Sequence, residues 1–198
     1  MCEKRKILLI TASVSEQSLS TDIAERFVAD ACASGEGGIC EKMDLCNEDI
    51  PRMTSELVRA FGDGTIVEVC PKALEYVEKF LNADIYVFAL PNYNKLTSAD
   101  VVSLLNLLSL DERIYGRDSQ SGKLGNKRAV IIMTSGGDSL SGEDYSFGSR
   151  YVESVLSQFG VMDIIVERVD DTDNHKGKRK LDAALAELKD IASDYLIY

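Results

Sequence analysis

The sequence predicts an α/β protein built around a parallel sheet of five strands, because short apolar runs alternate with segments of helical periodicity. The apolar runs have the length of strands and lie at 6–11, 39–45, 85–90, 128–134 and 162–169. The run at 85–90 (IYVFAL) shows no polar alternation, which indicates a central strand covered by helices on both faces. Helical segments between successive strands imply right-handed crossovers within one parallel sheet.

The composition indicates a globular and strongly acidic chain. It has 198 residues, of which 45% are hydrophobic and 28% are charged, and its formal net charge is -11. We expect one domain over 1–198, since a core of this size is stable alone. The negative charge disfavours nucleic acid and anionic membranes as partners. The apolar run near the N-terminus is too short for a signal peptide or a membrane span, so we expect a cytoplasmic protein.

The cysteine and histidine content argues against metal sites and side-chain nucleophiles. The five cysteines include no C-x-x-C pair, and His175 is the only histidine in the sequence. We therefore expect reduced thiols, no zinc site and no nucleophile activated by histidine.

The first predicted strand, 6–11, is followed by a hydroxyl-rich segment, ASVSEQSLST at 12–21. Apolar residues then recur at helical spacing, at Ile23, Ala24, Phe27 and Ala31. We expect Ser20 to cap this helix. The hydroxyl groups either act only as caps or, with the free N–H groups of the helix start, hold a phosphate. The segment contains no glycine, so it matches neither the dinucleotide fingerprint nor the Walker A loop.

The next elements lead up to the central strand. The run at 39–45 partly alternates, as in a strand nearer the edge of a sheet. A short helix is predicted at 55–61, ended by the glycine-rich residues 62–64. A longer helix begins near Pro71, which the first turn of a helix tolerates. Its predicted core face consists of Leu74, Val77, Phe80 and Leu81.

Pro91 ends the central strand, because proline cannot donate to a sheet ladder and biases the preceding residue to extended backbone. Tyr93 and Asn94 then lie just past the carboxyl end of the strand. Open parallel sheets bind their ligands at that edge, so this segment is either part of a binding site or an ordinary surface loop.

The segment ADVVSLLNLLSL at 99–110 is apolar on nearly every side of a helix. Such a helix requires burial all round. We expect a second subunit to cover the face that does not meet the sheet, which predicts a homodimer. The alternative is that the polar insertion at 111–127, which contains Tyr115, covers this face.

The fourth strand, 128–134, is followed directly by SGGDS at 135–139. Paired glycines would let the backbone of this loop approach a flat ligand closely. The alternative is a plain surface loop. A helix then extends from Phe147 to Gly160. The basic run at 174–180 is expected to be a solvated loop rather than a phosphate site. The last helix is predicted over 181–195. Because no glycine fingerprint follows the first strand, we favour the strand order 2-1-3-4-5, with its switch point between strands 1 and 3.

These motifs together resemble the FMN-dependent NADH:quinone oxidoreductase or azoreductase family, formerly described as acyl carrier protein phosphodiesterases. The resemblance implies a flavodoxin-like three-layer sandwich over essentially the whole chain. It rests on Ser18-Leu19-Ser20, on Pro91-Asn92-Tyr93-Asn94, on Thr134-Ser135-Gly136-Gly137, on the turn with Asp44-Leu45 and Ile50-Pro51, and on Phe159-Gly160-Val161-Met162-Asp163. The family commonly has methionine at the position of Asn92 and phenylalanine at the position of Lys95.

The resemblance also implies the site. The FMN phosphate would be held by Ser13, Ser18, Leu19 and Ser20. The isoalloxazine ring would be flanked by Pro91, Asn92, Tyr93, Asn94, Lys95, Ser135, Gly136 and Gly137. We assign Tyr115 to the substrate pocket.

The implied activity is a ping-pong reaction in which NADH or NADPH transfers hydride to FMN and a quinone or azo compound is then reduced. The cofactor carries this chemistry, so the sequence needs no acid, base or nucleophile among its side chains. Two alternatives share the same scaffold. One is a flavodoxin-like electron carrier, and the other is a flavin-free interaction module.

Overall fold

The computed structural model describes residues 4–33, 38–136, 147–170, 172 and 175–195. Its centre is a five-stranded parallel sheet in the order β2-β1-β3-β6-β7, which confirms the predicted order 2-1-3-4-5. The strands are β1 (Arg5–Thr11), β2 (Gly38–Asp44), β3 (Ile85–Pro91), β6 (Arg128–Thr134) and β7 (Asp163–Val169). Each begins and ends within one or two residues of its predicted bounds.

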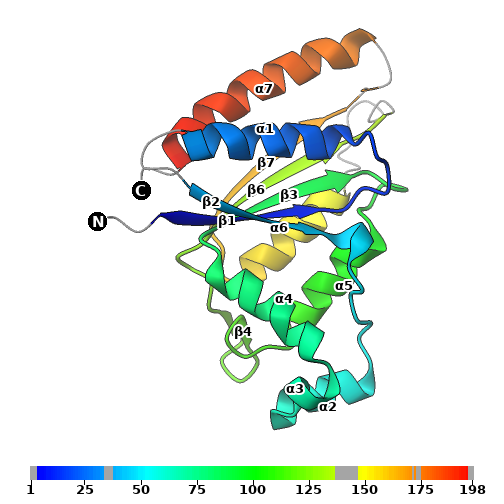
Figure 1. Ribbon diagram of the computed structural model, residues 1–198, viewed down its shortest axis with the longest axis vertical. Helices are drawn as coiled ribbons and strands as arrows, with labels where there is room; N and C mark the ends of the chain where they lie inside the picture. Colours follow the sequence, from blue (N-terminus) through cyan, green and yellow to red (C-terminus); the bar gives the residue numbers. More distant parts are fainter. Residues whose placement is uncertain (1–3, 34–37, 137–146, 171, 173–174, 196–198) are drawn as a thin grey trace.

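Helices cover both faces of the sheet (Figure 1). On one face lie α1 (Leu19–Ala33) and α7 (His175–Tyr195), and on the other lie α4 (Pro71–Asn82), α5 (Ala99–Leu108) and α6 (Phe147–Gln158). Successive side chains of β1 point to opposite faces of the sheet, and both faces are apolar, so both need a cover of helices. Ile7 and Leu9 are buried in the cluster that includes α1 and α7, whereas Leu8 and Ile10 are buried in the opposite cluster. All seven residues of β3 are buried, as expected for the central strand.

The predicted short helix at 55–61 is α2 (Ser55–Asp63). Three other short elements were not predicted. They are the 3-10 turn η1 (Leu45–Asn47), the helix α3 (Ile66–Val69), and the hairpin of β4 (Tyr115–Gly116) and β5 (Ser121–Gly122). The hairpin lies inside the polar insertion at 111–127, for which no secondary structure was predicted. Two-residue strands carry too few side chains for an alternating pattern to appear in the sequence.

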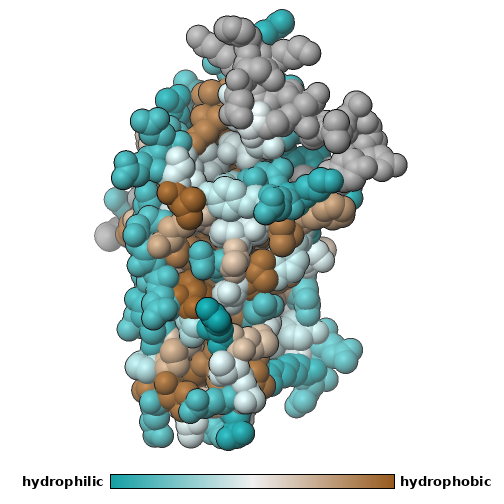
Figure 2. Space-filling view, turned by 90° about the vertical axis from the view of Figure 1, so that its right-hand side faces the viewer, coloured by the Kyte–Doolittle hydropathy of each residue, from teal (hydrophilic) through white to brown (hydrophobic). Residues whose placement is uncertain are grey.

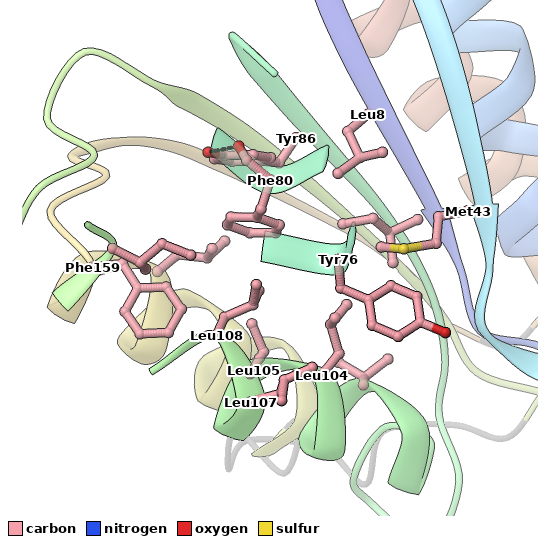
Figure 3. Packing of buried hydrophobic residues seen from close by; sticks show 14 of the residues in the cluster. Leu8, Met43, Tyr76, Phe80, Tyr86, Leu104, Leu105, Leu107, Leu108 and Phe159 are labelled. Atoms are coloured by element: carbon pink, nitrogen blue, oxygen red, sulfur yellow. Dashed lines mark hydrogen bonds between the residues drawn. The ribbon is translucent and has the colours of Figure 1, made fainter. Parts of the chain in front are cut away.

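The helix α5 is buried within the chain itself, which corrects the reasoning that led to a second subunit. Leu104, Leu105, Leu107 and Leu108 are each at most 1% exposed. They share one cluster with Tyr76 and Phe80 of α4 and with Phe159 (Figure 3). Ile114 and Leu124 of the insertion belong to the same cluster. The structure therefore supports the alternative, in which the insertion at 111–127 helps to cover α5. The helix leaves no fully apolar face exposed.

The basic run at 174–180 was expected to be a loop, and from His175 onward this is wrong, because α7 begins there. Lysine and arginine are good helix formers, and a polar first turn shows no apolar periodicity that would reveal the helix. In the part of the chain that the structure describes, no helix combines the length and apolar character needed to cross a lipid bilayer.

Candidate functional site

The candidate site lies where the loops after β1, β3 and β6 meet at the carboxyl edge of the sheet. The strand register brings these loops to one level, since Thr11 pairs with Ala89, and Pro91 pairs with Thr134. Figure 2 looks onto this edge and shows apolar side chains in separate groups among hydrophilic ones. Val14 and Leu96 are among the large apolar residues exposed here. The edge is also the predicted switch point, where parallel sheets bind ligands.

The first loop ends in a helix cap. Helix α1 begins at Leu19, so the residue before it, Ser18, is the N-cap. The Ser18 Oγ accepts a hydrogen bond from the backbone N–H of Thr21 at 3.3 Å, as an N-cap side chain does. The prediction that Ser20 caps this helix is therefore wrong. Both serines precede apolar helical residues, and only the backbone geometry decides which one stands outside the helix.

The hydroxyl groups at the cap form a small network. The Ser18 Oγ also accepts from the Thr21 Oγ1 at 3.0 Å and lies 3.1 Å from the Ser20 Oγ. A hydroxyl oxygen has two lone pairs and one proton. The two lone pairs of the Ser18 Oγ accept the bonds from the N–H and the hydroxyl of Thr21, so we infer that Ser18 donates its proton to the Ser20 Oγ. The Ser20 proton and the backbone N–H groups of Leu19 and Ser20 then have no acceptor among the described residues. Thr21, which the sequence analysis did not single out, completes this network.

These donors form the kind of site that binds a phosphate ester. They are neutral hydroxyl and amide groups, and they stand at the N-terminus of a helix of 15 residues, where the helix dipole favours an anion. Ser13 lies in the same loop and accepts from the backbone N–H of Ser15 at 3.2 Å. The donor set therefore fits the phosphate of FMN without a lysine or arginine.

The second loop is a tight turn directly after β3. Asn94 and Lys95 have positive φ angles of 53° and 69°. Tyr93 and Leu96 exchange both backbone hydrogen bonds across them, at 2.8 and 3.0 Å. Two positive φ angles inside such a pair define a type I′ turn. Of the residues that the resemblance places along the flavin ring, Asn94 and Lys95 thus form a tight two-residue turn, and Tyr93 flanks it.

This turn is fixed from three sides. The phenol oxygen of Tyr93 accepts a hydrogen bond from the backbone N–H of Val14 at 3.2 Å, which joins the turn to the first loop. The backbone N–H of Asn92 donates to the carbonyl of Thr134 at 3.0 Å, which joins it to β6. At its back lies Gly148 of α6, where a Cβ atom would come within 2.9 Å of the backbone of Leu96 and of the next residue. Gly148 is a positioning residue that only the structure reveals.

The third loop is described only in part. The backbone N–H of Ser135 donates to the carbonyl of Val169 at 3.0 Å, and the Ser135 carbonyl accepts from the N–H and the hydroxyl of Thr172 at 3.2 and 3.1 Å. These bonds hold Ser135 beside the end of β7, and Gly136 follows it directly. The remaining predicted ring contact, Gly137, lies outside the described residues. The first two loops therefore carry the geometric argument for the site.

Tyr115 does not join this site within one chain. It pairs with Gly122 in the β4–β5 hairpin, and a Cβ atom at Gly122 would collide with the backbone of Phe159 and Gly160. Those residues connect α6 to the amino end of β7, so the hairpin lies at the edge of the sheet opposite the candidate site. The assignment of Tyr115 to the substrate pocket is not supported by the arrangement of a single chain.

The described cysteines supply no reactive thiolate to the edge. Cys32, Cys40, Cys46 and Cys70 form no disulfide. Cys46 lies nearest the site, in η1 after β2. Burial, and then the carboxylates of Asp44 and Asp100, raise the pKa of the Cys46 thiol, which is therefore protonated and weakly nucleophilic at neutral pH.

Comparison with known proteins identifies the family of the chain. The profile of the family described as "Flavodoxin-like fold" matches residues 5–192. The FMN-dependent NADH:quinone oxidoreductase 2 of Listeria monocytogenes serotype 4b is 30% identical over 186 residues, covering 83% of this chain and 88% of that protein. The FMN-dependent NADH:quinone oxidoreductase of Coprothermobacter proteolyticus is 29% identical over 202 residues, covering 96% and 99%.

Solved structures show the same fold. The azoreductase from Bacillus anthracis str. Sterne superimposes with a TM-score of 0.84 at 21% identity, covering 96% of this chain and 99% of that one. The FMN-dependent NADH-azoreductase from Bacillus anthracis str. Ames Ancestor, solved in complex with FMN, gives a TM-score of 0.84 at 19% identity, covering 97% and 100%. From the family profile and the curated relatives, the chain belongs to the flavodoxin-like family that includes the FMN-dependent NADH:quinone oxidoreductases.

Proposed function

We propose that this protein is an FMN-dependent oxidoreductase that uses NADH or NADPH to reduce quinones or azo compounds. The observation that carries the proposal is the Tyr93–Val14 hydrogen bond, because it joins an anion-binding helix start to a rigid turn at the switch point. A phosphate site and a ring site at one edge are the two parts that binding of FMN requires. The names of the relatives supply the electron donor and the acceptor class.

The residues of the chain would divide into two roles. The N–H groups of Leu19 and Ser20 and the Ser20 hydroxyl would hold the phosphate, while Ser18 keeps these donors in place as the cap. Pro91, Asn92, Tyr93 and Asn94 would flank the ring, with Ser135 and Gly136 at its polar edge and Gly137 beside them. When bound, FMN accepts a hydride from the nicotinamide and passes the two electrons on to the acceptor.

No side chain would take part in bond making, since the chain only has to orient the ring and exclude competing reactions. The donor and the acceptor would occupy the same face of the site in turn, which gives ping-pong kinetics. Exposed apolar residues beside the turn, Val14 and Leu96, are suited to contact a flat aromatic acceptor.

A homodimer stays a prediction, and α5 no longer provides the reason for it. The position of Tyr115 gives a different reason to expect a dimer. Because the hairpin lies at the opposite edge of its own sheet, Tyr115 would reach a substrate pocket only as part of a second chain. Sedimentation equilibrium of the purified protein at micromolar concentration would measure the oligomeric state.

The experiment that tests the function is an absorption spectrum of the purified protein followed by steady-state kinetics. We expect bands near those of free FMN, and parallel lines in double-reciprocal plots when NADH and a benzoquinone are varied. A flavoprotein that oxidises neither NADH nor NADPH would favour the alternative function as an electron carrier. A protein that binds no FMN when the cofactor is added would favour the flavin-free module.

A further inference from the structure

The end of helix α1 and the beginning of strand β2 each carry a free cysteine. Cys32 lies in the last turn of α1 and is half-buried. Cys40 lies near the start of β2 and is exposed. Both residues are close to the amino edge of the sheet, at the opposite end from the candidate site, so the proposed function makes no use of either thiol.

The face of β2 that carries Cys40 is the face that α1 covers. Side chains alternate between the two faces of a strand, so Gly38, Cys40 and Lys42 share one face. The Lys42 Nζ pairs with the Glu25 Oε1 of α1 at 2.7 Å. Glu41, which points the other way, pairs instead with a lysine of α4 at 2.8 Å. The Cys40 side chain is therefore on the side of α1.

The position of Cys32 along α1 brings it to the level of Cys40. Helix α1 and strand β2 run in opposite directions (Figure 1). Cys32 follows Glu25 by two helical turns, so the two residues lie on the same side of α1, roughly 10 Å apart. The same distance along β2 covers roughly three residues and leads from Lys42 to between Gly38 and Cys40. The structure agrees, since the Cys32 Sγ lies 3.2 Å from the place of a Cβ atom at Gly38.

The electrostatics of Cys40 agree with this proximity. Burial, and then the neighbouring Cys32 sulfur, raise the pKa of the Cys40 thiol, although the backbone of Leu9 lowers it. Coulomb interactions weaken with distance, so an effect of Cys32 on this pKa places the two sulfur atoms near each other. A protonated thiol is a weak nucleophile, so Cys40 reacts slowly with oxidants at neutral pH. The pair therefore stays reduced unless the supply of oxidant is sustained.

We propose that Cys32 and Cys40 form a disulfide when the protein meets hydrogen peroxide, and that this bond ties the end of α1 to β2. One sulfur attacks an oxygen of the peroxide, so that an S–O bond forms, the O–O bond breaks and one water leaves. The second sulfur then displaces the oxygen of this sulfenic acid as a second water, and the S–S bond forms. Two thiols thus lose two electrons and two protons, and one peroxide is reduced to two waters.

The bond requires only a local change of structure. A disulfide holds the two Cβ atoms at about 3.5–4.5 Å. The Cys32 sulfur already reaches Gly38, and Cys40 lies two residues further along the same face, roughly 7 Å from Gly38. Rotation of both cysteine side chains and a shift of the last turn of α1 would close this gap, since helix ends fray easily. The exposed ion pair of Lys42 with Glu25 stabilises this edge strand little, so the disulfide would be the stronger tie.

The test is to treat the reduced, purified protein with hydrogen peroxide at about pH 8.5, where a larger share of the thiols is ionised, and then to alkylate the thiols that remain. We expect a product lighter by two hydrogen atoms before alkylation, and a peptide map that links Cys32 to Cys40 within one chain. Dithiothreitol should restore both thiols. Cys40→Ser should form no such bond, and its fold should be intact because Cys40 is exposed. Cys46→Ser is the matched control and should behave like the parent.

Thermal unfolding measures what the bond does. The oxidised parent should unfold several degrees above the reduced parent, because a cross-link restricts the unfolded chain, and Cys40→Ser should show no such shift. An unfolding temperature that does not rise would mean that the bond does not tie α1 to β2. A map that links other cysteines, a bond between two chains, or two thiols that remain open to alkylation would each overturn the proposal. None of these measurements depends on FMN, so this proposal and the proposed function can fail separately.

Discussion

The phenol oxygen of Tyr93 accepts a hydrogen bond from the backbone N–H of Val14, although 79 positions separate the two residues. The bond joins the loop that would hold a phosphate to the turn that would hold a ring. The bond therefore fixes the position of the two loops relative to each other before any ligand binds. Such preorganisation raises affinity because less ordering remains to be done on binding.

Tyr93→Phe should weaken FMN binding by about twofold to tenfold, the range for one neutral hydrogen bond of roughly 0.5–1.5 kcal/mol. Riboflavin lacks the phosphate and makes no use of the first loop, so its affinity should fall less. Fluorescence quenching on titration measures both constants. Equal losses for FMN and riboflavin would show that the bond does not couple the two loops.

Ser18 offers a pair of variants that differ only in charge. Asparagine and aspartate both cap helices well, so Ser18→Asn and Ser18→Asp should unfold at similar temperatures, whereas Ser18→Ala should lose about 0.5–2 kcal/mol of stability. Aspartate also places a negative charge beside the phosphate. We therefore expect Ser18→Asp to lose most FMN affinity while Ser18→Asn keeps more of it. If the two variants bind FMN alike, the phosphate lies elsewhere.

Gly148→Ala should move the turn after β3. Its Cβ atom would lie 2.7 Å from the Met133 Cε and 2.9 Å from the backbone of Leu96, and crowding of this kind costs about 1–3 kcal/mol. FMN affinity should fall together with stability. Gly62→Ala is the matched control, because that helical position has no atom within 4 Å and alanine should stabilise α2 by up to about 1 kcal/mol. An unchanged FMN affinity in Gly148→Ala would mean that the turn does not depend on α6.

Leu104→Ala should destabilise the fold by about 2–5 kcal/mol, since the side chain is fully buried within one chain. Asn106→Ala, on the exposed side of the same helix, should change stability by less than about 0.5 kcal/mol. Urea unfolding measures both. A Leu104→Ala protein that keeps its stability but changes its oligomeric state would restore the idea that this face of α5 meets a second subunit.

Glu48 should give the fold a dependence on acid pH. Its Oε2 accepts a hydrogen bond from the Tyr76 hydroxyl at 3.0 Å and pairs with the Lys72 Nζ at 3.1 Å. Burial by itself raises the pKa of Glu48, but the hydrogen bonds from Lys72 and Tyr76 and the positive charges of Lys72 and Lys79 outweigh it, so the net shift is downward. A lowered folded-state pKa means that the stabilisation is present above the unfolded pKa of about 4.3 and is lost as the pH falls through the folded value.

We therefore expect Glu48→Gln to be less stable than the parent near pH 7, with the difference shrinking below about pH 4. Urea unfolding at several pH values between 3 and 7 gives the comparison. Glu75→Gln is the control, since Glu75 is exposed and 3.5 Å from the same lysine, and it should behave like the parent. A difference for Glu48→Gln that is the same at every pH would contradict the lowered pKa.

The sequence by itself determined the sheet, its order and the positions of most helices. Continuous apolar runs and helical periodicity are local properties of the chain, and the path between successive parallel strands follows from chirality. The hydroxyl run before α1, the Pro91 break after β3 and the paired glycines after β6 are equally local, which is why all three loops of the site could be named in advance.

The tertiary structure decided which groups meet. The Tyr93–Val14 bond and the packing of Gly148 against Leu96 join residues that no local pattern connects. The burial of α5 depends on how an insertion folds back over it, which its polar composition conceals. The left-handed conformation of Lys95 is imposed by its neighbours against the preference of the residue itself. These features arise from contacts between distant segments, and such contacts exist only once the sheet has brought the segments together.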